Sequence, residues 1–246
     1  MQGNLLRITG PQSDLNFSKT ETVRLGTAEI ACHRHGRGET IICLHATGHS
    51  ARDFLQLAHD LEDRFEFIAI DWPGQGDSPR GAVVASADAY ADVLGGVIAA
   101  LDIGDHYIIG NSIGGAAAII HASREPAQLK GLILCNPGGL QAVNFFARLY
   151  CRHMARLFSK GAQGHTAFGR KFRRYYEKTV LSNAAAEWRR EEIIATGYDV
   201  APILQEAWAG FAQPQADIRA KIAELSMPIL YAWAEGDQAV AWSRSK

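Results

Sequence analysis

Residues 105–119, DHYIIGNSIGGAAAI, contain a short apolar run, a turn with glycine on both sides, and an alanine-rich run. We interpret this order as a strand, a sharp turn and a helix, with Ser112 at the apex of the turn. Gly110 and Gly114 stand where a side chain would collide with the neighbouring strand or helix. Such a turn directs the Ser112 hydroxyl, the Ile113 amide and the helix N-terminus toward one point. With 24 glycines in the chain a chance match is the alternative, but the placement between strand and helix argues against chance.

Two further apolar runs precede this segment. Thr40–Leu44 is followed by HATG, and Phe67–Ile70 is followed by DWPGQGDS. Both runs are continuous rather than alternating, as is typical of parallel strands that are buried on both faces. Residues 51–61 and 87–101 have helical spacing and lie between successive runs. The alternation of strand and helix predicts an α/β fold with a parallel sheet covered on both faces.

In LHATG, DWPGQGDS, GNSIGG and residues 228–237 the chain resembles the α/β-hydrolase family, and the resemblance extends from about residue 21 to the last residue. It implies a mostly parallel sheet with helices on both faces and a helical cap inserted between strands. The implied core comprises residues 21–138 and 226–246, and the cap comprises residues 139–225. Residues 1–20 are expected to form a loose leader.

The resemblance also assigns catalytic roles. Ser112 is expected to be the nucleophile, which loses its proton to a base as it attacks a carbonyl. The Ile113 amide and the amide of Thr47 are the expected donors to the resulting oxyanion. Asp237 follows a buried strand and matches the acid that holds the imidazole of the base. Glu235 is the nearby alternative for that acid.

The HATG loop and the nucleophile turn contain the other expected site residues. Ala46 stands where the family usually has glycine, and it requires an ordinary backbone angle. We interpret His45 as structural, bonding the turn together. His49 either contacts substrate or is a solvated loop residue. Ala46, His49 and Asn111 are therefore the expected substrate-binding residues.

The catalytic histidine of the family is missing from its expected place. In the family it follows the acid after one more strand, but only nine residues follow Asp237 here. We expect that the natural chain continues past Lys246 and supplies the last strand, the histidine loop and the closing helix. Within the insert, His153 and His165 are the alternatives for the base.

The insert after the strand Leu132–Cys135 has about 85 residues without a strand pattern. Its helical stretches place Phe146, Tyr150 and Leu157 on one face, which resembles a helical cap. Residues 141–190 contain eleven lysines or arginines and two acidic residues. This basic stretch either steers acidic substrates or is the solvated face of amphipathic helices.

Composition limits the class of protein. The 246 residues are 47% hydrophobic with a net charge of −1, which is enough for one substantial core. No apolar run approaches the length of a membrane span, and the first residues do not resemble a signal peptide. The four cysteines have no zinc spacing, so a reduced, cytoplasmic protein is expected. We expect no metal, no cofactor, no nucleic-acid partner and no membrane partner.

The resemblance implies a serine hydrolase that acts through an acyl-enzyme on a small carboxylic ester, thioester, lactone or related carbonyl compound. Ser112 argues against the dehalogenases and epoxide hydrolases of the family, which use aspartate at this position. GNSIGG is also similar to the turn of hydrolases that cleave carbon–carbon bonds in ring-fission products. A non-catalytic ligand-binding protein of the same fold is the third alternative.

Overall fold

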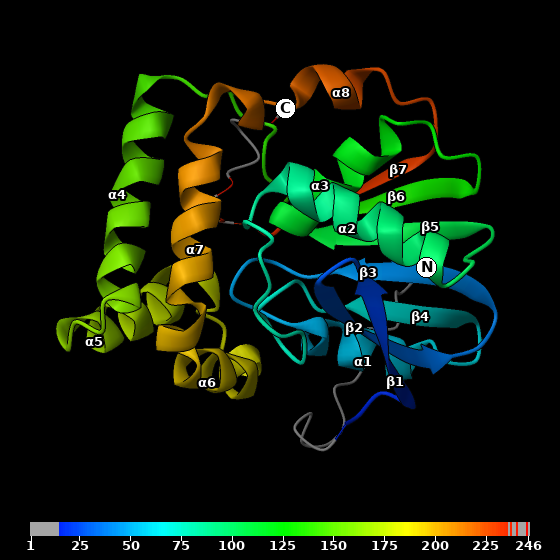
Figure 1. Ribbon diagram of the computed structural model, residues 1–246, viewed down its shortest axis with the longest axis horizontal. Helices are drawn as coiled ribbons and strands as arrows, with labels where there is room; N and C mark the ends of the chain where they lie inside the picture. Colours follow the sequence, from blue (N-terminus) through cyan, green and yellow to red (C-terminus); the bar gives the residue numbers. More distant parts are fainter. Residues whose placement is uncertain (1–14, 236, 238–239, 241–244, 246) are drawn as a thin grey trace.

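The computed structural model describes residues 15–235, 237, 240 and 245. A seven-stranded sheet in the order β1-β2-β4-β3-β5-β6-β7 lies at its centre (Figure 1). The strands are β1 Lys19–Leu25, β2 Ala28–Gly36, β3 Glu39–Leu44, β4 Phe65–Ile70, β5 His106–Asn111, β6 Leu129–Cys135 and β7 Ile229–Ala232. β1 and β2 pair antiparallel with each other, β2 pairs antiparallel with β4, and the remaining pairs are parallel. The predicted α/β fold with a mostly parallel sheet is therefore confirmed.

The antiparallel hairpin of β1 and β2 was not predicted. β1 alternates exposed and partly buried residues and contributes only Val23 to the buried core. It therefore has no continuous apolar run of the kind that marks β3 and β4. The expected leader, residues 1–20, lies mostly outside the described residues, but β1 already begins at Lys19.

Helices cover both faces of the sheet. They are α1 Leu55–Asp60, α2 Ala87–Ala100, α3 Ile113–Ala122, α4 Phe145–Ala162, α5 Ala167–Tyr175, α6 Glu187–Ala195, α7 Gly197–Phe211 and α8 Arg219–Ala223. α2 and α3 share a buried cluster with Ile42 and Ile68, whereas α1 shares a different cluster with Ile41 and Phe67. Neighbouring residues of one strand thus point to opposite, covered faces. Residues 51–61, expected as one helix, begin instead with a 3₁₀ turn, Ala51–Phe54.

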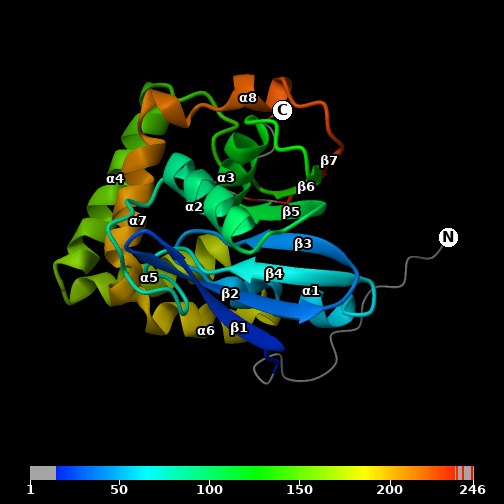
Figure 2. The ribbon, with the colours of Figure 1, turned by 45° about the vertical axis from the view of Figure 1, so that its right-hand side comes forward.

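The insert is helical, as its sequence predicts. α4, α5, α6 and α7 lie together at one side of the sheet in both Figure 1 and Figure 2. They enclose a separate buried cluster that includes Phe158, Phe168, Phe172 and Leu204. Asn144 begins α4 by accepting a hydrogen bond from the Ala147 amide at 2.9 Å. The helices over the sheet are therefore supported by a core of their own.

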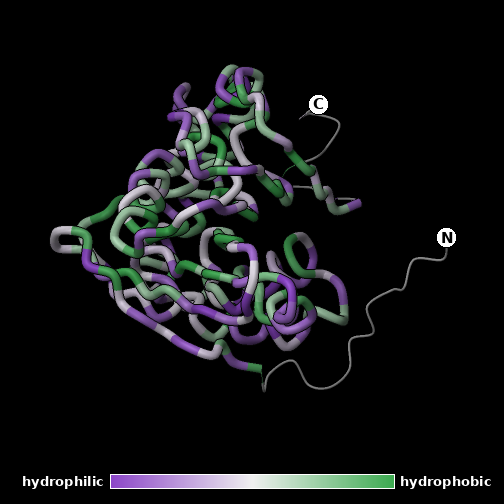
Figure 3. Tube along the Cα trace, turned by 90° about the vertical axis from the view of Figure 1, so that its right-hand side faces the viewer, coloured by the Kyte–Doolittle hydropathy of each residue, from purple (hydrophilic) through white to green (hydrophobic). Residues whose placement is uncertain are grey.

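Hydrophobic and hydrophilic residues are interspersed along the described trace (Figure 3). In keeping with this pattern, none of the helices in the described part of the chain is long and apolar enough to cross a membrane. The four cysteines are all free thiols.

A buried histidine in α3 gives the fold a predictable acid sensitivity. Neither ring nitrogen of His121 has a hydrogen-bond partner among the described residues, and burial lowers its pKa to about 4. Between pH 6.5 and 4 the unfolded chain binds a proton at His121 that the folded chain does not. The free energy of unfolding is therefore expected to fall over this range, by at most about 1.4 kcal/mol per pH unit from this residue.

Urea unfolding measured at several pH values tests this expectation. His121→Leu should flatten the fall in stability between pH 6.5 and 4, whereas the same change at the exposed His153 should leave it unaltered. Equal slopes for wild type and His121→Leu would show that His121 is not buried as the neutral imidazole.

Candidate active site

Ser112 occupies the turn between β5 and α3 in an uncommon backbone conformation. Its φ of 54° and ψ of −116° lie outside the regions that an L-residue normally adopts. The Ser112 carbonyl accepts hydrogen bonds from the amides of Ala116 and Gly138, at 3.1 and 2.9 Å. Its own amide donates to the Cys135 carbonyl. The Ser112 hydroxyl makes no hydrogen bond to another described residue, so this turn presents an unengaged hydroxyl.

The glycines around Ser112 are required by close contacts. A Cβ on Gly110 would lie 2.7 Å from the backbone of Gly114, and a Cβ on Gly114 would lie 2.3 Å from the Leu44 carbonyl oxygen. Real Cβ atoms do not approach other atoms this closely. The prediction that the flanking residues must lack side chains is confirmed.

The two expected oxyanion donors have unengaged amides. Within the described residues, neither the Ile113 amide nor the Thr47 amide donates a hydrogen bond. Ala46 is not among the described residues with positive φ, so it has the ordinary backbone angle that was predicted. The sharp bend of the loop falls instead at Gly48, with a φ of 81°.

Gln75 holds the loop that contains Thr47, a role that sequence analysis did not assign. Its side-chain oxygen accepts a hydrogen bond from the Gly48 amide at 2.5 Å, and its side-chain nitrogen donates to the Tyr90 hydroxyl at 2.9 Å. Tyr90 in turn stacks on Trp72, with ring centroids 4.3 Å apart. Because Gln75 is only 1% exposed, this series of buried contacts holds Gly48 from inside the protein.

His45 is part of the turn and not of the chemistry. Its Nδ1 is 2.7 Å from the Ala46 carbonyl oxygen, and its Nε2 accepts a hydrogen bond from the Trp72 amide. Burial lowers the pKa of His45 to about 4, so the ring is neutral at pH 7. The structural interpretation of His45 is confirmed by these bonds.

Asp71 organises the DWPGQGDS turn beside this loop. Its carboxylate accepts hydrogen bonds from the amides of Ala51 and Asp77, at 2.7 and 2.8 Å, and lies 2.9 Å from His33 Nε2. Burial would raise the pKa of Asp71, but these partners outweigh it and lower the pKa. A Cβ on Gly76 would overlap the Asp71 carboxylate, which explains the glycine in the motif.

Asp237 is held next to the nucleophile turn by Asn136. The Asn136 side-chain nitrogen donates to Asp237 Oδ2 at 2.5 Å, and its side-chain oxygen accepts from the Ala234 amide. Asp237 Oδ1 accepts from the Val240 amide at 2.8 Å. This role of Asn136 is not evident from the sequence alone. The alternative acid, Glu235, is exposed.

The strand order brings Ser112 and Asp237 to the same end of the sheet, where the parallel strands have their carboxyl ends. β5, β6 and β7 are adjacent and parallel, so their carboxyl ends lie side by side. Ser112 bonds to Cys135 and Gly138, while Asn136 in the same segment bonds to Asp237. The segment after β6 therefore connects the nucleophile turn with the acid loop.

Among the described residues, no histidine contacts the Asp237 carboxylate. Neither a hydrogen bond nor an ion pair joins any described histidine to its carboxylate. Of the two alternatives for the base, His153 is exposed on α4. His165 follows α4 and lies 3.3 Å from the side chain of Gln163, also in solvent. The structure thus brings neither histidine to the acid.

The helical insert covers the Thr47 loop and approaches the acid. A Cβ on Gly48 would lie 3.2 Å from the Leu204 side chain and 3.3 Å from the Tyr176 hydroxyl oxygen. Burial raises the pKa of Tyr175, and the nearby charge of Asp237 adds to this effect. Tyr176, which directly follows α5, therefore lies over the loop that contains Thr47.

A buried ion pair fastens α6 to the core. Arg189 is 8% exposed and donates to Asp53 Oδ1 at 2.6 Å and to Ser50 Oγ at 2.9 Å. His49 Nδ1 lies 2.7 Å from the other oxygen of Asp53. Burial would raise the pKa of Asp53, but His49 and Arg189 outweigh it and lower the pKa. His49 is therefore a buried residue bonded to Asp53, and not a solvated loop histidine. Asn111, the other expected substrate-binding residue, is the last residue of β5 and is partly buried.

A cavity of about 290 Å³ lies beside the nucleophile turn, between α2, α3 and α7. Ile113, Ala207, Phe211 and Ile218 contribute to its lining, but Ser112, Thr47 and Asp237 do not. Because the cavity does not reach these groups, we do not assign the substrate to it.

Comparison with known proteins identifies the family. The family model of the alpha/beta hydrolase fold matches residues 39–246, and the chain therefore belongs to this family. A 2-hydroxy-6-oxononadienedioate/2-hydroxy-6-oxononatrienedioate hydrolase from Cupriavidus pinatubonensis is 32% identical over 146 residues, which are 56% of this chain. The chain matches 49% of that relative, or about half of its length.

Solved structures share the fold. A thermophilic esterase from Thermogutta terrifontis has a TM-score of 0.74 at 21% identity, covering 93% of this chain and 84% of that chain. An N-acyl homoserine lactonase in complex with N-hexanoyl homoserine has a TM-score of 0.67 at 20% identity, covering 89% of this chain and 78% of that one. At such identities the likeness establishes the fold alone.

Proposed function

We propose that the protein is a serine hydrolase that acts through an acyl-enzyme on a small carboxylic ester, thioester, lactone or related carbonyl compound. The observation that carries this proposal is the conformation of Ser112, which presents an unengaged hydroxyl at the N-terminus of α3. Backbone strain of this kind is maintained where function requires it. The unengaged amides of Ile113 and Thr47 add the donors that an oxyanion needs.

In the proposed reaction the Ser112 oxygen attacks the substrate carbonyl as a general base takes the hydroxyl proton. The Ile113 and Thr47 amides donate to the developing oxyanion. The base then protonates the leaving alcohol or thiol. In the second stage the base takes a proton from water, whose oxygen attacks the acyl carbonyl, and returns that proton to Ser112 Oγ as the acyl–oxygen bond breaks and the acid is released. Asp237 is proposed to orient the base, and Asn136 to hold Asp237 in place.

Labelling with a fluorophosphonate probe tests the proposal. The protein should be isolated from its source and its intact mass measured before and after exposure to the probe. One adduct that maps to Ser112 supports the hydrolase. Folded protein that takes up no adduct contradicts it and favours a ligand-binding protein of the same fold.

A carbon–carbon bond hydrolase is the second candidate. It is supported by GNSIGG and by the similarity to the Cupriavidus relative, whose name describes such a reaction. Turnover of p-nitrophenyl acetate should be compared with that of a 2-hydroxy-6-oxo-dienedioate, whose loss is followed by its absorbance. A kcat/KM at least about a hundredfold higher for the dienedioate would favour this candidate over the esterase.

Gln75 is expected to affect catalysis through Gly48 and the Thr47 amide. We expect Gln75→Ala to lower kcat by about ten- to a hundredfold, since losing an oxyanion donor outright has a larger effect of about 10²–10³-fold. KM should change less, because the donor acts mainly on the transition state. Gln56→Ala, at a half-buried glutamine on α1 whose side chain donates to Asp60, is the matched control and should leave kcat unaltered. An unchanged kcat in Gln75→Ala would remove Gln75 from this role.

A further inference from the structure

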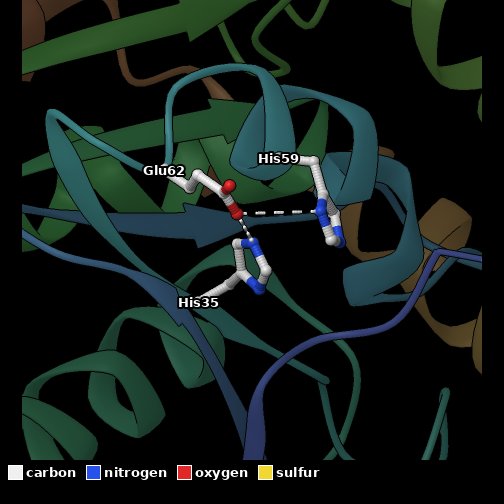
Figure 4. Close-up of side chains that lie close together, drawn as sticks. All are labelled: His35, His59 and Glu62. Carbon is white, nitrogen blue, oxygen red and sulfur yellow. Dashed lines mark hydrogen bonds and ion pairs between the residues drawn. The ribbon is translucent and has the colours of Figure 1, made fainter. Parts of the chain in front are cut away.

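Three side chains that no part of the proposed reaction uses converge at another edge of the sheet. His35 comes from the end of β2, His59 from the last turn of α1, and Glu62 from the turn after α1. Figure 4 shows that both imidazoles face the Glu62 carboxylate. Glu62 Oε2 lies 2.7 Å from His35 Nε2 and 3.9 Å from His59 Nδ1. The three facing atoms all lie within 4.8 Å of one another.

The outer nitrogens of the two imidazoles are engaged by other groups. His59 Nε2 lies 2.9 Å from the carbonyl oxygen of Asn16 and must donate to it, because a carbonyl only accepts. In the neutral ring this leaves a lone pair on His59 Nδ1, the atom that faces Glu62. His35 Nδ1 lies 2.8 Å from Ser18 Oγ. Histidines that bind metals usually have their second nitrogen engaged in this way.

The contact between His59 and Glu62 lacks a proton donor in this arrangement. A lone pair on Nδ1 faces a carboxylate oxygen at 3.9 Å, which is beyond hydrogen-bond distance. A cation between the two atoms would satisfy both. Two imidazoles and one carboxylate are ligands that Zn²⁺ prefers, at about 2.0–2.2 Å from each ligand atom.

The backbone that holds these ligands is fixed, while one side chain can adjust. Gly36 has a φ of 82°, and a Cβ on it would lie 3.0 Å from the Glu62 Cα. The Arg37 amide also donates to the Glu62 carbonyl at 2.9 Å. The Glu62 side chain is 50% exposed, so its carboxylate can move by the fraction of an ångström that an ion requires.

We propose that His35, His59 and Glu62 form a site for Zn²⁺, with water completing the coordination. On binding, the neutral His35 ring changes tautomer: the proton leaves Nε2 and one is taken up at Nδ1, which then donates to Ser18 Oγ. His35 Nε2, His59 Nδ1 and the Glu62 carboxylate bind the ion. No sequence motif predicts the site, because His35 and His59 are distant in the sequence and meet only through the packing of α1 on β2.

The position of the site indicates a stabilising role. His35 pairs with Phe67 near the start of β4, whereas Ser112 follows the carboxyl end of the parallel β5. The site therefore lies near the amino ends of the parallel strands, whereas the turn at Ser112 lies at their carboxyl ends. A bound ion would connect β2 and α1, and through Ser18 and the Asn16 carbonyl the segment before β1.

A second cluster, His33, Asp71 and Asp77, consists of one histidine and two aspartates and has a different role. Asp71 already accepts hydrogen bonds from two backbone amides and from His33. These bonds account for its carboxylate without an ion, so we assign no metal there.

Calorimetric titration of the untagged, metal-free protein with ZnCl₂ tests the proposal. We expect one ion per chain with a micromolar Kd, and a rise in Tm of about 5 °C at saturating Zn²⁺. Glu62→Gln keeps the size of the side chain but removes the charge, and it should weaken binding at least about tenfold, as should His59→Ala. Asp63→Asn removes an exposed neighbouring carboxylate and is the matched control, with an unaltered Kd.

Binding that is equally tight in Glu62→Gln and the wild type, or a Kd in the millimolar range, would overturn the proposal. Crystals soaked in Zn²⁺ give a measurement that does not depend on the folding of a variant. An anomalous difference peak between His35, His59 and Glu62 is the expected result, and a peak only elsewhere would contradict the site.

Discussion

Ser112→Ala is expected to lower kcat of the natural protein by at least about 10⁴-fold, since a serine hydrolase without its nucleophile keeps only the rate that binding and the oxyanion donors supply. The assay is hydrolysis of a p-nitrophenyl ester that the wild type turns over. Ser123→Ala, at the other end of α3, is the matched control, because its hydroxyl only bonds the Ile120 carbonyl. Activity within tenfold of wild type in Ser112→Ala would show that another residue is the nucleophile.

The fold of the variant should survive, so that a loss of activity can be assigned to chemistry. The Ser112 hydroxyl bonds no described residue, and alanine inherits the same strained φ of 54°. Ser112→Gly is expected to raise the free energy of unfolding by about 1 kcal/mol, because glycine adopts positive φ without that strain. A Gly variant that is more stable but inactive would demonstrate that the strain at this position serves function rather than folding.

The features that were predictable from sequence are local in the chain. The buried strands appear as continuous apolar runs, and the turn at Ser112 appears as a serine between glycines that lack space for a side chain. Asp237 is predicted as the acid from its place after an apolar run. That run does form a strand, β7, but the expectation that it is buried is wrong, because Leu230 is 62% exposed and Tyr231 is 41% exposed. In each case neighbouring residues contain the whole signal, so no knowledge of the packing is needed.

The features that were missed depend on partners distant in sequence. Asn136 bonds Asp237 across 101 positions, and Arg189 bonds Ser50 across 139. Gln75 stands in a recognised motif, but its partners, Gly48 and Tyr90, are set by how the loops pack. Such roles arise from tertiary contacts that no spacing of residue types encodes. The catalytic base stays a prediction, because no described histidine contacts the acid.

Arg189→Ala is expected to destabilise the protein by about 3–5 kcal/mol, the effect of removing one partner from a buried ion pair. Asp53 would then keep a buried carboxylate with the His49 ring as its remaining side-chain partner. Urea unfolding at pH 7 measures the change. The matched control is Arg173→Ala on α5, which breaks an exposed pair with Glu191 and should have a much smaller effect. A loss at Arg189 no larger than that at Arg173 would contradict the role of the buried pair.

The pH dependence of stability provides an independent test of the same pair. Because folding lowers the pKa of Asp53, its contribution is present above the pKa of the unfolded aspartate, about 3.9, and is lost as the pH falls through the lower folded value. Without Arg189 the burial of Asp53 opposes its charge more strongly, and its folded pKa should rise. In Arg189→Ala, the titration of Asp53 should therefore contribute less to the fall in the free energy of unfolding at acid pH. Asp53→Asn should accordingly destabilise the wild type more than it destabilises Arg189→Ala, and equal effects in both backgrounds would mean that the two residues are not coupled.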